Sequence, residues 1–488
     1  MKKTFPLLAL LLVILTACPR KKDQIADNAT TSQLVADSAY LYTKEVYLWN
    51  TLPGIGTYES FNPRKFANAD LVKTADDVIK SIRSLHTADQ FSYATSVEES
   101  NQTQTGEGVD WGFFVKGGLV ASPSSEANVR WFVTYVYNTS DAASKGVKRG
   151  WIVNKVDGIE MRGGQASIDK LNAIFFGTVT SASIEFVKPD GAVQTLNINK
   201  TKFTANSVLY STVFTNGTKK TGYLVFNTFL GTTAASNELV TTFNNFISQG
   251  INELIIDLRN NLGGSTAMQD FLANIIVPAA RTGQTMYRYE FNQQLQQDNF
   301  PLLKKKFGWS NGAFKPANNT ETFVKNGTLA LSRIFFIVTD NTASSSELLI
   351  NNLKPVMDVK LVGESNTYGK PVGFFPIDLF DKVSLYPISF RTVNSVGAEV
   401  AYAGFAPDKQ AIDGLNKDWG DVTEPCLANS LAYINTGSFL AAAPATTIST
   451  IPRSVTADRS KLLDKRRKER VGMILSGKED DLSGTKLK

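Results

Sequence analysis

Apolar strand-like runs alternate with helical patterns along the second half of the chain, and this alternation constrains the fold more than any other feature. The runs at 223–226, 254–258, 334–338 and 359–362 are almost continuous in apolar residues. Such runs are typical of strands that are buried on both faces of a sheet. Between them, apolar residues recur every three or four positions, as in amphipathic helices. The pattern predicts an α/β region with a parallel or mixed sheet and helices on its faces.

Helical and polar segments precede this region. Leu34, Leu41 and Leu48 recur with another apolar residue one position behind each, which predicts a helix with a narrow apolar stripe. A second helix is predicted around 76–85, and the polar segment 98–108 predicts a loop. Together these patterns indicate a small helical N-terminal domain.

Short strand patterns fill the segment between the two regions. An apolar run with a glycine at its start lies at 111–115. Further strands are predicted at 133–137, 151–156, 182–186 and 196–198. Asp157-Gly158 has the composition of a tight hairpin turn. This segment is predicted to be a small β module.

Composition excludes several classes of function. The net charge of +6 is small for 488 residues and gives no support for a nucleic-acid-binding protein. His86 is the only histidine and there are two cysteines, which excludes a His- or Cys-based zinc site. A Ser-His-Asp triad would need His86, which lies far from any nucleophile signal, so we expect it to pack or face solvent. The base for a serine nucleophile would then be a lysine or a carboxylate. Cys426 opens an apolar stretch and is expected to be a small buried hydrophobe.

The N-terminus has the features of a targeting segment. Lys2 and Lys3 precede an apolar run over 5–15 that is too short for a permanent membrane-spanning helix. The residues that lead into Cys18 resemble a bacterial lipobox, which implies cleavage before Cys18 and attachment of lipid to it. The alternative is an ordinary signal peptide with an incidental cysteine. The expected location is the cell envelope of a bacterium, lipid-anchored in the periplasm or at the outer membrane.

A turn rich in glycine follows the run at 254–258. It contains Gly263 and Gly264, whose backbone amides can approach a ligand closely at the start of a helix. This turn could hold a phosphate or an oxyanion, although it lacks the phosphate-loop pattern. Taken alone, a tight turn needed only for packing is the simpler interpretation.

Ser344 lies in a second turn, where the run at 334–338 passes into a helix. A serine at such a place can expose its Oγ while the next backbone N–H points the same way. The alternative is that Ser344 or Thr342 only caps the helix and Glu347 completes a capping box.

Lys370 follows a glycine just after the run at 359–362 and precedes apolar residues. A useful base near neutral pH needs its pKa lowered by roughly 3 units from about 10.4, a differential cost of about 4 kcal/mol that burial and two positive helix ends could supply. The alternative is a solvated lysine in a loop.

Together, the segments 259–264, 342–347 and 363–370 resemble, in order and spacing, the motifs of the carboxyl-terminal processing (tail-specific) proteases, peptidase family S41. The segment 146–158 is similar to the PDZ module of that family. The resemblance covers about 34–435. It implies an α+β and α/β multidomain fold with an N-terminal helical domain, a PDZ-like β module and a βα-repeat protease core of the crotonase/ClpP-like type.

The resemblance also implies roles for individual residues. Ser344 matches the catalytic nucleophile of the family and Lys370 its base. The backbone amides of Gly263, Gly264 and Ser345 match the oxyanion hole.

The loop of Trp111, Gly112, Phe113 and Phe114 matches the carboxylate-binding loop of the PDZ module. The chain also departs from the family pattern. Leu262 stands where proline is common, and Thr342 and Ser345 replace the usual serine and alanine of the nucleophile turn. Phe374 stands where many members have glutamine, so the polar residue that would orient Lys370 is missing or supplied elsewhere.

These patterns together predict six segments. They are a lipoprotein signal peptide (1–17), a tether (18–33), an N-terminal helical domain (34–104), a PDZ-like domain (105–200), an S41 protease core (201–440) and a basic C-terminal tail (441–488).

The implied function is that of a serine endopeptidase with a Ser/Lys dyad, acting on extended or unfolded proteins whose C-termini bind the PDZ module. The expected partners are protein or peptide substrates and, through Cys18, a membrane; nucleic acid, metal and organic cofactors are not expected. One alternative is a non-catalytic peptide-binding lipoprotein with a protease-like fold, which the position of Phe374 favours. Another is an acyl-transfer or hydratase-type enzyme on a related sheet.

Overall fold

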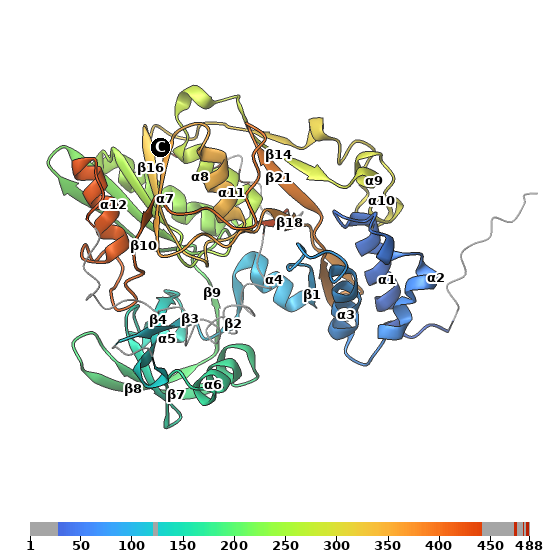
Figure 1. Cartoon of the computed structure of the whole chain (residues 1–488), viewed down its shortest axis with the longest axis horizontal. Helices are drawn as coiled ribbons and strands as arrows, with labels where there is room; N and C mark the ends of the chain where they lie inside the picture. The colour runs from blue at the N-terminus through green and yellow to red at the C-terminus, as the bar shows by residue number, and fades with distance from the viewer. Residues whose placement is uncertain (1–27, 121–124, 442–472, 476–481, 483–484, 488) are drawn as a thin grey trace, which may run out of the picture.

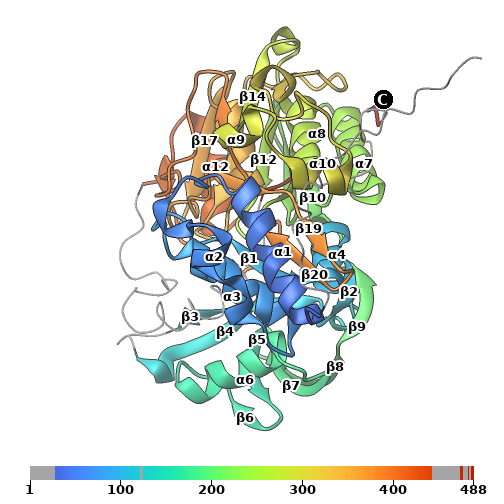
Figure 2. The same cartoon turned by 90° about the vertical axis from the view of Figure 1, so that its right-hand side faces the viewer.

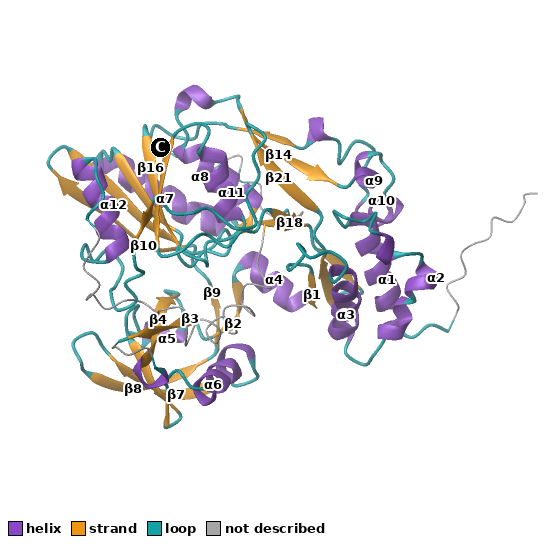
Figure 3. Cartoon of the chain, viewed as in Figure 1, coloured by secondary structure: helices purple, strands orange, loops and turns teal. Residues whose placement is uncertain are grey.

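The computed structural model describes residues 28–120, 125–441, 473–475, 482 and 485–487 (Figure 1). The predicted signal peptide, Cys18, most of the tether and most of the basic tail lie outside these residues. Three parts are visible: N-terminal helices, a small β module and a large α/β body (Figures 1 and 3).

The N-terminal part begins with three helices that pack around Tyr40. They are α1 (Thr31–Val46), α2 (Tyr58–Phe61) and α3 (Leu71–Arg83). The Tyr40 ring stacks on Phe61 with 4.6 Å between ring centroids. The predicted stripe of α1 is confirmed only in part, because Val35 is fully buried but Leu41 is 38% exposed, and the fully buried Tyr40 lies outside the stripe. A seven-residue recurrence drifts around a helix of 3.6 residues per turn, so it did not identify the buried face.

The polar segment predicted as a loop is instead a helix, α4 (Val97–Thr105). The Ser96 hydroxyl accepts the backbone N–H of Glu99 and starts it, and Gly106, with φ of 74°, ends it. Ser100 on the inner face lies 2.7 Å from the Tyr386 hydroxyl of the large body. Tertiary packing and caps therefore stabilise a helix that has no apolar stripe.

The N-terminal part shares its core with the large body. Strand β1 (Tyr93–Ser96) pairs antiparallel with β20 (Val383–Tyr386), which pairs with β19 (Ile377–Leu379). Buried residues of α1 and α3 belong to the same apolar cluster as those of the large body. The predicted N-terminal domain is thus neither purely helical nor separately packed.

The β module is a twisted antiparallel sheet with one long helix, α6 (Gln165–Phe176). Its strands are β3 (Phe113–Leu119), β4 (Val129–Val136), β5 (Ile152–Val156), β6 (Ile159–Glu160), β7 (Ser181–Val187) and β8 (Val193–Asn199), with the short helix α5 (Asp141–Ser144). The path order is β3-β4-β5-β7-β8, so β3 is an edge strand within the described residues. A ribbon of β2 (Glu107–Asp110) and β9 (Thr201–Thr204) connects the module to the rest of the chain (Figure 2).

The α/β body is built on a six-stranded sheet of order β10-β11-β12-β16-β17-β22. The strands are β10 (Val208–Asn216), β11 (Lys219–Phe226), β12 (Glu253–Asp257), β16 (Arg333–Val338), β17 (Asp358–Gly363) and β22 (Lys409–Gln410). All pairs from β11 onward are parallel, and β10 pairs antiparallel with β11. The four predicted apolar runs lie on β11, β12, β16 and β17.

Helices cover both faces of this sheet. Helices α7 (Thr233–Gln249), α8 (Thr266–Ile276) and α11 (Ser345–Leu353) belong to the apolar cluster of one face, and α12 (Pro425–Thr436) to that of the other. The strand residues alternate between the two clusters: Phe336 faces the first and Phe335 the second. Burial on both faces explains why the strands are almost continuously apolar.

A second sheet, not predicted from the sequence, lies beside the first and has the order β13-β23-β18-β21-β14-β15. Its strands are β13 (Gly264–Ser265), β23 (Met473–Ile474), β18 (Val372–Phe374), β21 (Phe390–Asn394), β14 (Thr285–Phe291) and β15 (Thr320–Thr322). The short helices α9 (Gln293–Gln296) and α10 (Pro301–Phe307) join it to α1 (Figure 1).

Two features are absent from the described residues. None of the helices described is both long enough and apolar enough to span a bilayer. No cluster of three or more histidine, cysteine, aspartate or glutamate side chains in the described ranges is arranged to bind a metal ion. Cys426 is fully buried, and its thiol lies near the carbonyls of Ala411 and Ile412.

Candidate active site

Ser344 stands at the start of α11 in an unusual backbone conformation. Its φ is 60° and its ψ is −113°, a region that residues other than glycine rarely adopt. Such strain costs of order 1–3 kcal/mol and is concentrated at functional sites. The side chain is fully buried, and its Oγ has no hydrogen-bond partner among the described residues. Ser344 and Glu347 occupy the two positions of a capping box, as the alternative interpretation predicts, although Oγ makes no regular hydrogen bond to the helix backbone. Capping does not require the strained backbone of Ser344.

Glu347 connects the serine turn to the lysine loop. Its carboxylate accepts the backbone N–H of Ser344 at 2.9 Å, of Gly369 at 2.7 Å and of Lys370 at 2.9 Å, and the Thr367 hydroxyl at 2.6 Å. Burial raises the pKa of Glu347, and these donors oppose the rise. The glutamate half of the capping box is therefore present, and the same carboxylate also holds the backbone of Lys370.

Lys370 is fully buried between two aromatic rings. Its Nζ lies 4.9 Å from the ring centroid of Phe91 and 4.5 Å from that of Phe374. Burial lowers the pKa of Lys370 to about 7, while the charges of Asp89 and Glu347 act in the opposite direction. The lowered pKa agrees with the expectation from the sequence and excludes a solvated loop lysine.

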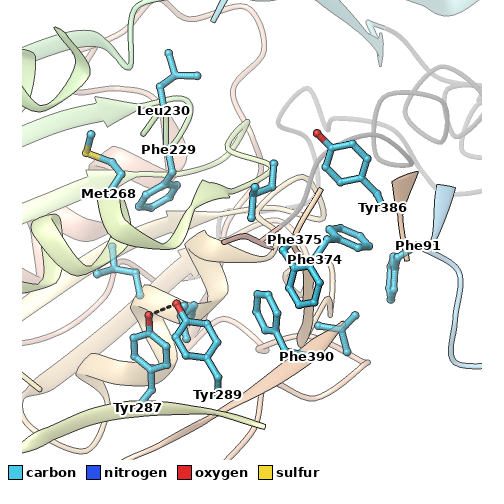
Figure 4. Close-up of a cluster of buried hydrophobic side chains, with 14 of the residues drawn as sticks. Phe91, Phe229, Leu230, Met268, Tyr287, Tyr289, Phe374, Phe375, Tyr386 and Phe390 are labelled. Atoms are coloured by element: carbon cyan, nitrogen blue, oxygen red, sulfur yellow. Dashed lines mark hydrogen bonds between the residues drawn. The ribbon is translucent and has the colours of Figure 1, made fainter. Parts of the chain in front are cut away.

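Phe374 occupies the position where many family members have glutamine. Figure 4 shows it within an aromatic cluster that includes Phe91, Tyr386 and Phe390. Its ring meets the rings of Tyr93 and Tyr386 edge-on. Phe374 thus desolvates the amine of Lys370 where a glutamine would offer it a hydrogen bond.

Asp89 comes from the N-terminal part, and no sequence pattern indicated a role for it. Its carboxylate accepts the Tyr47 hydroxyl at 2.8 Å, the Ser92 hydroxyl at 2.6 Å and the backbone N–H groups of Phe91 and Ser92 at 2.9 Å. The charge on Asp89 favours the protonated form of Lys370. His86, three residues earlier, stacks on Trp49 with 3.9 Å between ring centroids, which is a packing role.

The Gly263-Gly264 turn packs directly against Ser344. A Cβ on Gly263 would lie 2.9 Å from both the Ser344 Cβ and the Ser345 N, so only glycine fits. Gly263 and Gly264 have φ of 102° and 135°, and the Ser345 hydroxyl donates to the Gly264 carbonyl at 2.7 Å. The turn does not open the helix as predicted, because α8 begins two residues later. The three predicted oxyanion residues are therefore neighbours in space.

One of the three predicted oxyanion donors is already engaged. The N–H of Gly263 donates to the Asn261 Oδ1 at 2.9 Å. The Ser344 Oγ lacks a partner in the described part of the chain, so the Ser344–Lys370 hydrogen bond of a dyad is not formed in this structure. Catalytic hydrogen bonds are often long in ligand-free enzymes and shorten when substrate binds.

A buried charge cluster surrounds Arg259, at the start of the glycine turn, and it was not predicted from the sequence. Arg259 pairs with Asp257 at 2.7 Å, with Asp413 at 2.7 Å and with Glu424 at 3.0 Å. Arg149 of the β module reaches Asp413 at 2.8 Å. All five side chains are buried. The cluster fixes the start of the turn and joins the β module to the body.

The four residues predicted to bind a peptide C-terminus lie at the start of β3. Trp111, Phe113 and Phe114 are buried, and the indole of Trp111 donates to the Ile174 carbonyl of α6 at 2.8 Å. Gly112, with φ of 72°, packs against Ser140, where a Cβ would lie only 2.0 Å from the Ser140 Cβ. The side chains therefore form the core of the module, and a ligand would meet the backbone of this loop.

Residues 220–411 match the family model described as peptidase family S41. These residues are similar in sequence to the S41 peptidases. This region contains Ser344, Lys370, Glu347 and the Gly263-Gly264 turn. Asp89 and the β module lie before it in the chain.

Curated relatives and a solved structure are similar to the chain as well. A protein of Staphylococcus aureus (strain MRSA252), named as a CtpA-like serine protease, is 24% identical over 315 residues, which are 64% of this chain and 54% of the relative. A protein of the same name from Staphylococcus haemolyticus (strain JCSC1435) is 21% identical over 406 residues, 83% of this chain and 71% of the relative. The chain thus spans about half the length of the curated relatives it first matches.

A crystal structure from Bacteroides fragilis NCTC 9343, described as an S41 protease, has a TM-score of 0.61 and 20% identity. It covers 82% of this chain and 97% of its own length, which shows a shared fold. The mixed α/β multidomain fold is similar to that S41 protease structure. The family match and the names of the relatives support the predicted enzyme class, a serine-type peptidase and hydrolase.

Proposed function

We propose that the protein is a serine endopeptidase that cleaves extended or unfolded polypeptides, with Ser344 as nucleophile and Lys370 as general base. The observation that carries this proposal is the shared carboxylate of Glu347. It binds the backbone of a strained, buried serine and of a buried lysine whose pKa is lowered to about 7. A serine hydroxyl needs such a base because it is a weak nucleophile at its own pKa.

The proposed reaction proceeds in two stages. Neutral Lys370 takes the proton of the Ser344 hydroxyl as Oγ attacks the carbonyl carbon of the scissile peptide bond. Backbone amides of Gly263, Gly264 and Ser345 bind the negatively charged oxygen. For this, the Gly263 N–H must leave the Asn261 side chain, to which it donates in this structure, and donate to the oxyanion instead. The protonated lysine then passes its proton to the leaving amine, and an acyl-enzyme ester remains. Water, deprotonated by Lys370, hydrolyses the ester and releases the acid.

The β module is proposed to act as a PDZ-like domain that captures a substrate C-terminus. Edge strand β3 offers backbone groups to an extended peptide, and the loop at 111–114 offers amides to its terminal carboxylate. Lys116 of β3 lies 3.6 Å from Glu364, six residues before Lys370. A peptide on β3 would therefore lie close to the loop that carries the base.

A second candidate function is a peptide-binding protein without catalysis. Two observations favour it: the Ser344–Lys370 hydrogen bond is not formed, and Phe374 replaces a polar residue beside the lysine amine.

One experiment separates the two functions. The wild-type chain and the Ser344→Ala and Ser346→Ala variants are incubated with an unfolded casein-type substrate. Loss of a triad serine typically lowers kcat by about 10³-fold or more, so Ser344→Ala is expected to be inactive. The hydroxyl of Ser346 donates to the Asn261 carbonyl, so Ser346→Ala is a matched control that should keep most of the activity. Equal cleavage by wild type and Ser344→Ala would exclude the serine mechanism.

We further propose, from the sequence alone, that Cys18 carries lipid and holds the protein in a bacterial cell envelope. Cys18→Ser should move the protein from the membrane fraction to the soluble fraction and abolish labelling with radioactive palmitate. Unchanged fractionation and labelling would contradict a lipid anchor.

A further inference from the structure

Strand β23 fills a slot between the two halves of the candidate active site. Met473 pairs with Gly264 of β13 and with Gly373 of β18, and Ile474 pairs with Ser265 and Phe374; both pairings are parallel. Because adjacent strands lie about 4.8 Å apart, β13 and β18 are held about 10 Å apart, the width of one inserted strand.

The two walls of the slot belong to the catalytic segments. On one side, Gly264 is the second glycine of the turn that packs against Ser344. On the other side, β18 begins two residues after Lys370. The same slot is the natural path for a polypeptide that presents a peptide bond to both segments.

The inserted segment is held by its backbone, by the buried side chain of Ile474 and by the partly buried side chain of Leu475. The Leu475 N–H donates to the Phe374 carbonyl at 2.9 Å, and the Thr266 hydroxyl lies 3.5 Å from the Ile474 carbonyl. Ile474 is 3% exposed and belongs to the main apolar cluster. Main-chain pairing provides affinity with little demand on sequence, and a single pocket provides selectivity.

A second contact anchors the same part of the chain. The Asn326 side chain donates to the Thr485 carbonyl at 3.0 Å and accepts the Leu487 N–H at 3.2 Å. Leu487 is 9% exposed and covers Gly327, where a Cβ would lie 2.8 Å from its side chain. Two separate anchors in cis raise the effective concentration of Met473–Leu475 at the slot to the millimolar range.

We propose that the slot between β13 and β18 is the strand-binding site for polypeptide substrates, and that Met473–Leu475 of the same chain occupies it as a competitive, displaceable inhibitor. This inference rests on the proposed peptidase function and adds the mode of substrate binding and its regulation. The ligand class is an extended peptide with an aliphatic side chain at the position of Ile474.

The first test needs no catalysis. A fluorescein-labelled nonapeptide with the sequence of residues 470–478 is titrated into full-length Ser344→Ala protein that also carries Ile474→Asp or, as matched control, Ile474→Val. The buried aspartate should release the segment in cis, so the peptide should bind the Ile474→Asp protein at least about tenfold more tightly. Equal binding to both proteins, or binding to neither, would overturn the proposal.

The second test measures cleavage of an unfolded polypeptide with Ser344 intact. The kcat/KM of Ile474→Asp should rise about tenfold through a lower KM, and that of Ile474→Val should stay at the wild-type value. Leu475→Pro against Leu475→Ala repeats the comparison in case the aspartate impairs folding, because both variants lose the leucine side chain and only the proline also lacks the N–H that bonds the Phe374 carbonyl. If kcat/KM is the same within both pairs of variants, the inference is overturned, and the proposed peptidase function is unaffected. If the peptide binds as expected but no variant cleaves the polypeptide, the slot is supported as a peptide-binding site and the proposed peptidase function is excluded.

Discussion

The Glu347 carboxylate accepts the backbone N–H of Lys370 at 2.9 Å, although the two residues are 23 positions apart and Glu347 lies in α11 while Lys370 lies in the loop before β18. The same carboxylate accepts the N–H of Ser344. The nucleophile and the base are therefore positioned by one buried group that touches neither reacting atom. The proposed Ser344–Lys370 mechanism depends on this arrangement and on the burial of the lysine amine.

The pH dependence of the rate should report Lys370. Burial lowers the pKa of this lysine to about 7, and only the neutral amine can accept the serine proton. We expect kcat/KM to rise with pH and to level off above about pH 7. Lys325, whose pKa burial lowers to about 8, lies away from the site, and Lys325→Met is the control that should leave the profile unchanged. A profile without a limb near pH 7 would argue against Lys370 as the base.

Replacing the fully buried Glu347 should reduce the rate more than replacing a half-buried glutamate elsewhere. Glu347→Gln leaves some of four donors unpaired, and each such buried group costs about 1–3 kcal/mol. We expect a lower Tm and a kcat lowered about 100-fold by misplacement of the two catalytic residues. Glu238, which accepts the Val208 N–H, provides the control Glu238→Gln. If both variants lose stability and neither loses kcat, Glu347 has no positioning role.

Phe374→Gln should move the rise of kcat/KM with pH, the acid limb of the pH profile, to higher pH. The amide oxygen of glutamine would accept a hydrogen bond from protonated Lys370 and admit water, and both effects favour the charged amine. Phe374→Leu keeps the surroundings apolar and should leave the limb in place. The measurement is kcat/KM against pH for both variants. A shift of equal size in the two would mean that the ring acts only through packing.

The parts of the fold that could be predicted are those whose residues repeat a local pattern. Strands β12 and β16 were visible because both of their faces are buried. The second sheet was not, because β13, β18 and β23 are only two or three residues long and carry no periodicity. Asp89 and Arg259 could not be assigned roles either, because their surroundings come from segments distant in sequence. Lys370 was recognisable because apolar residues, Phe374 among them, follow it closely, whereas Phe91 on the other side of the amine could not be foreseen.

The cluster around Asp413 should control acid stability. Burial opposes ionisation, but Arg149 and Arg259 hold the pKa of Asp413 below its usual range. A carboxylate with a depressed folded-state pKa contributes stability above its unfolded value of about 4, and this contribution is lost as the pH falls below it.

Asp413→Asn should therefore lower the free energy of unfolding at pH 7 by about 3–5 kcal/mol. Below about pH 4, the free energy of unfolding of this variant should fall less steeply with pH than that of the wild type. The exposed pair of Asp421 with Lys417 supplies the control Asp421→Asn, which should cost about 1 kcal/mol or less. Urea unfolding at pH 7 and below pH 4 gives both quantities. Equal effects of the two substitutions would show that the buried cluster adds no stability.

The most direct test is a crystal structure of the full chain with a peptide aldehyde bound at pH 8. The Ser344–Lys370 mechanism predicts a covalent bond from the Ser344 Oγ to the aldehyde carbon, with the Lys370 Nζ within about 3.2 Å of that Oγ. An unmodified Ser344, or a Lys370 amine that remains several ångströms from the adduct, would contradict the Ser344–Lys370 mechanism.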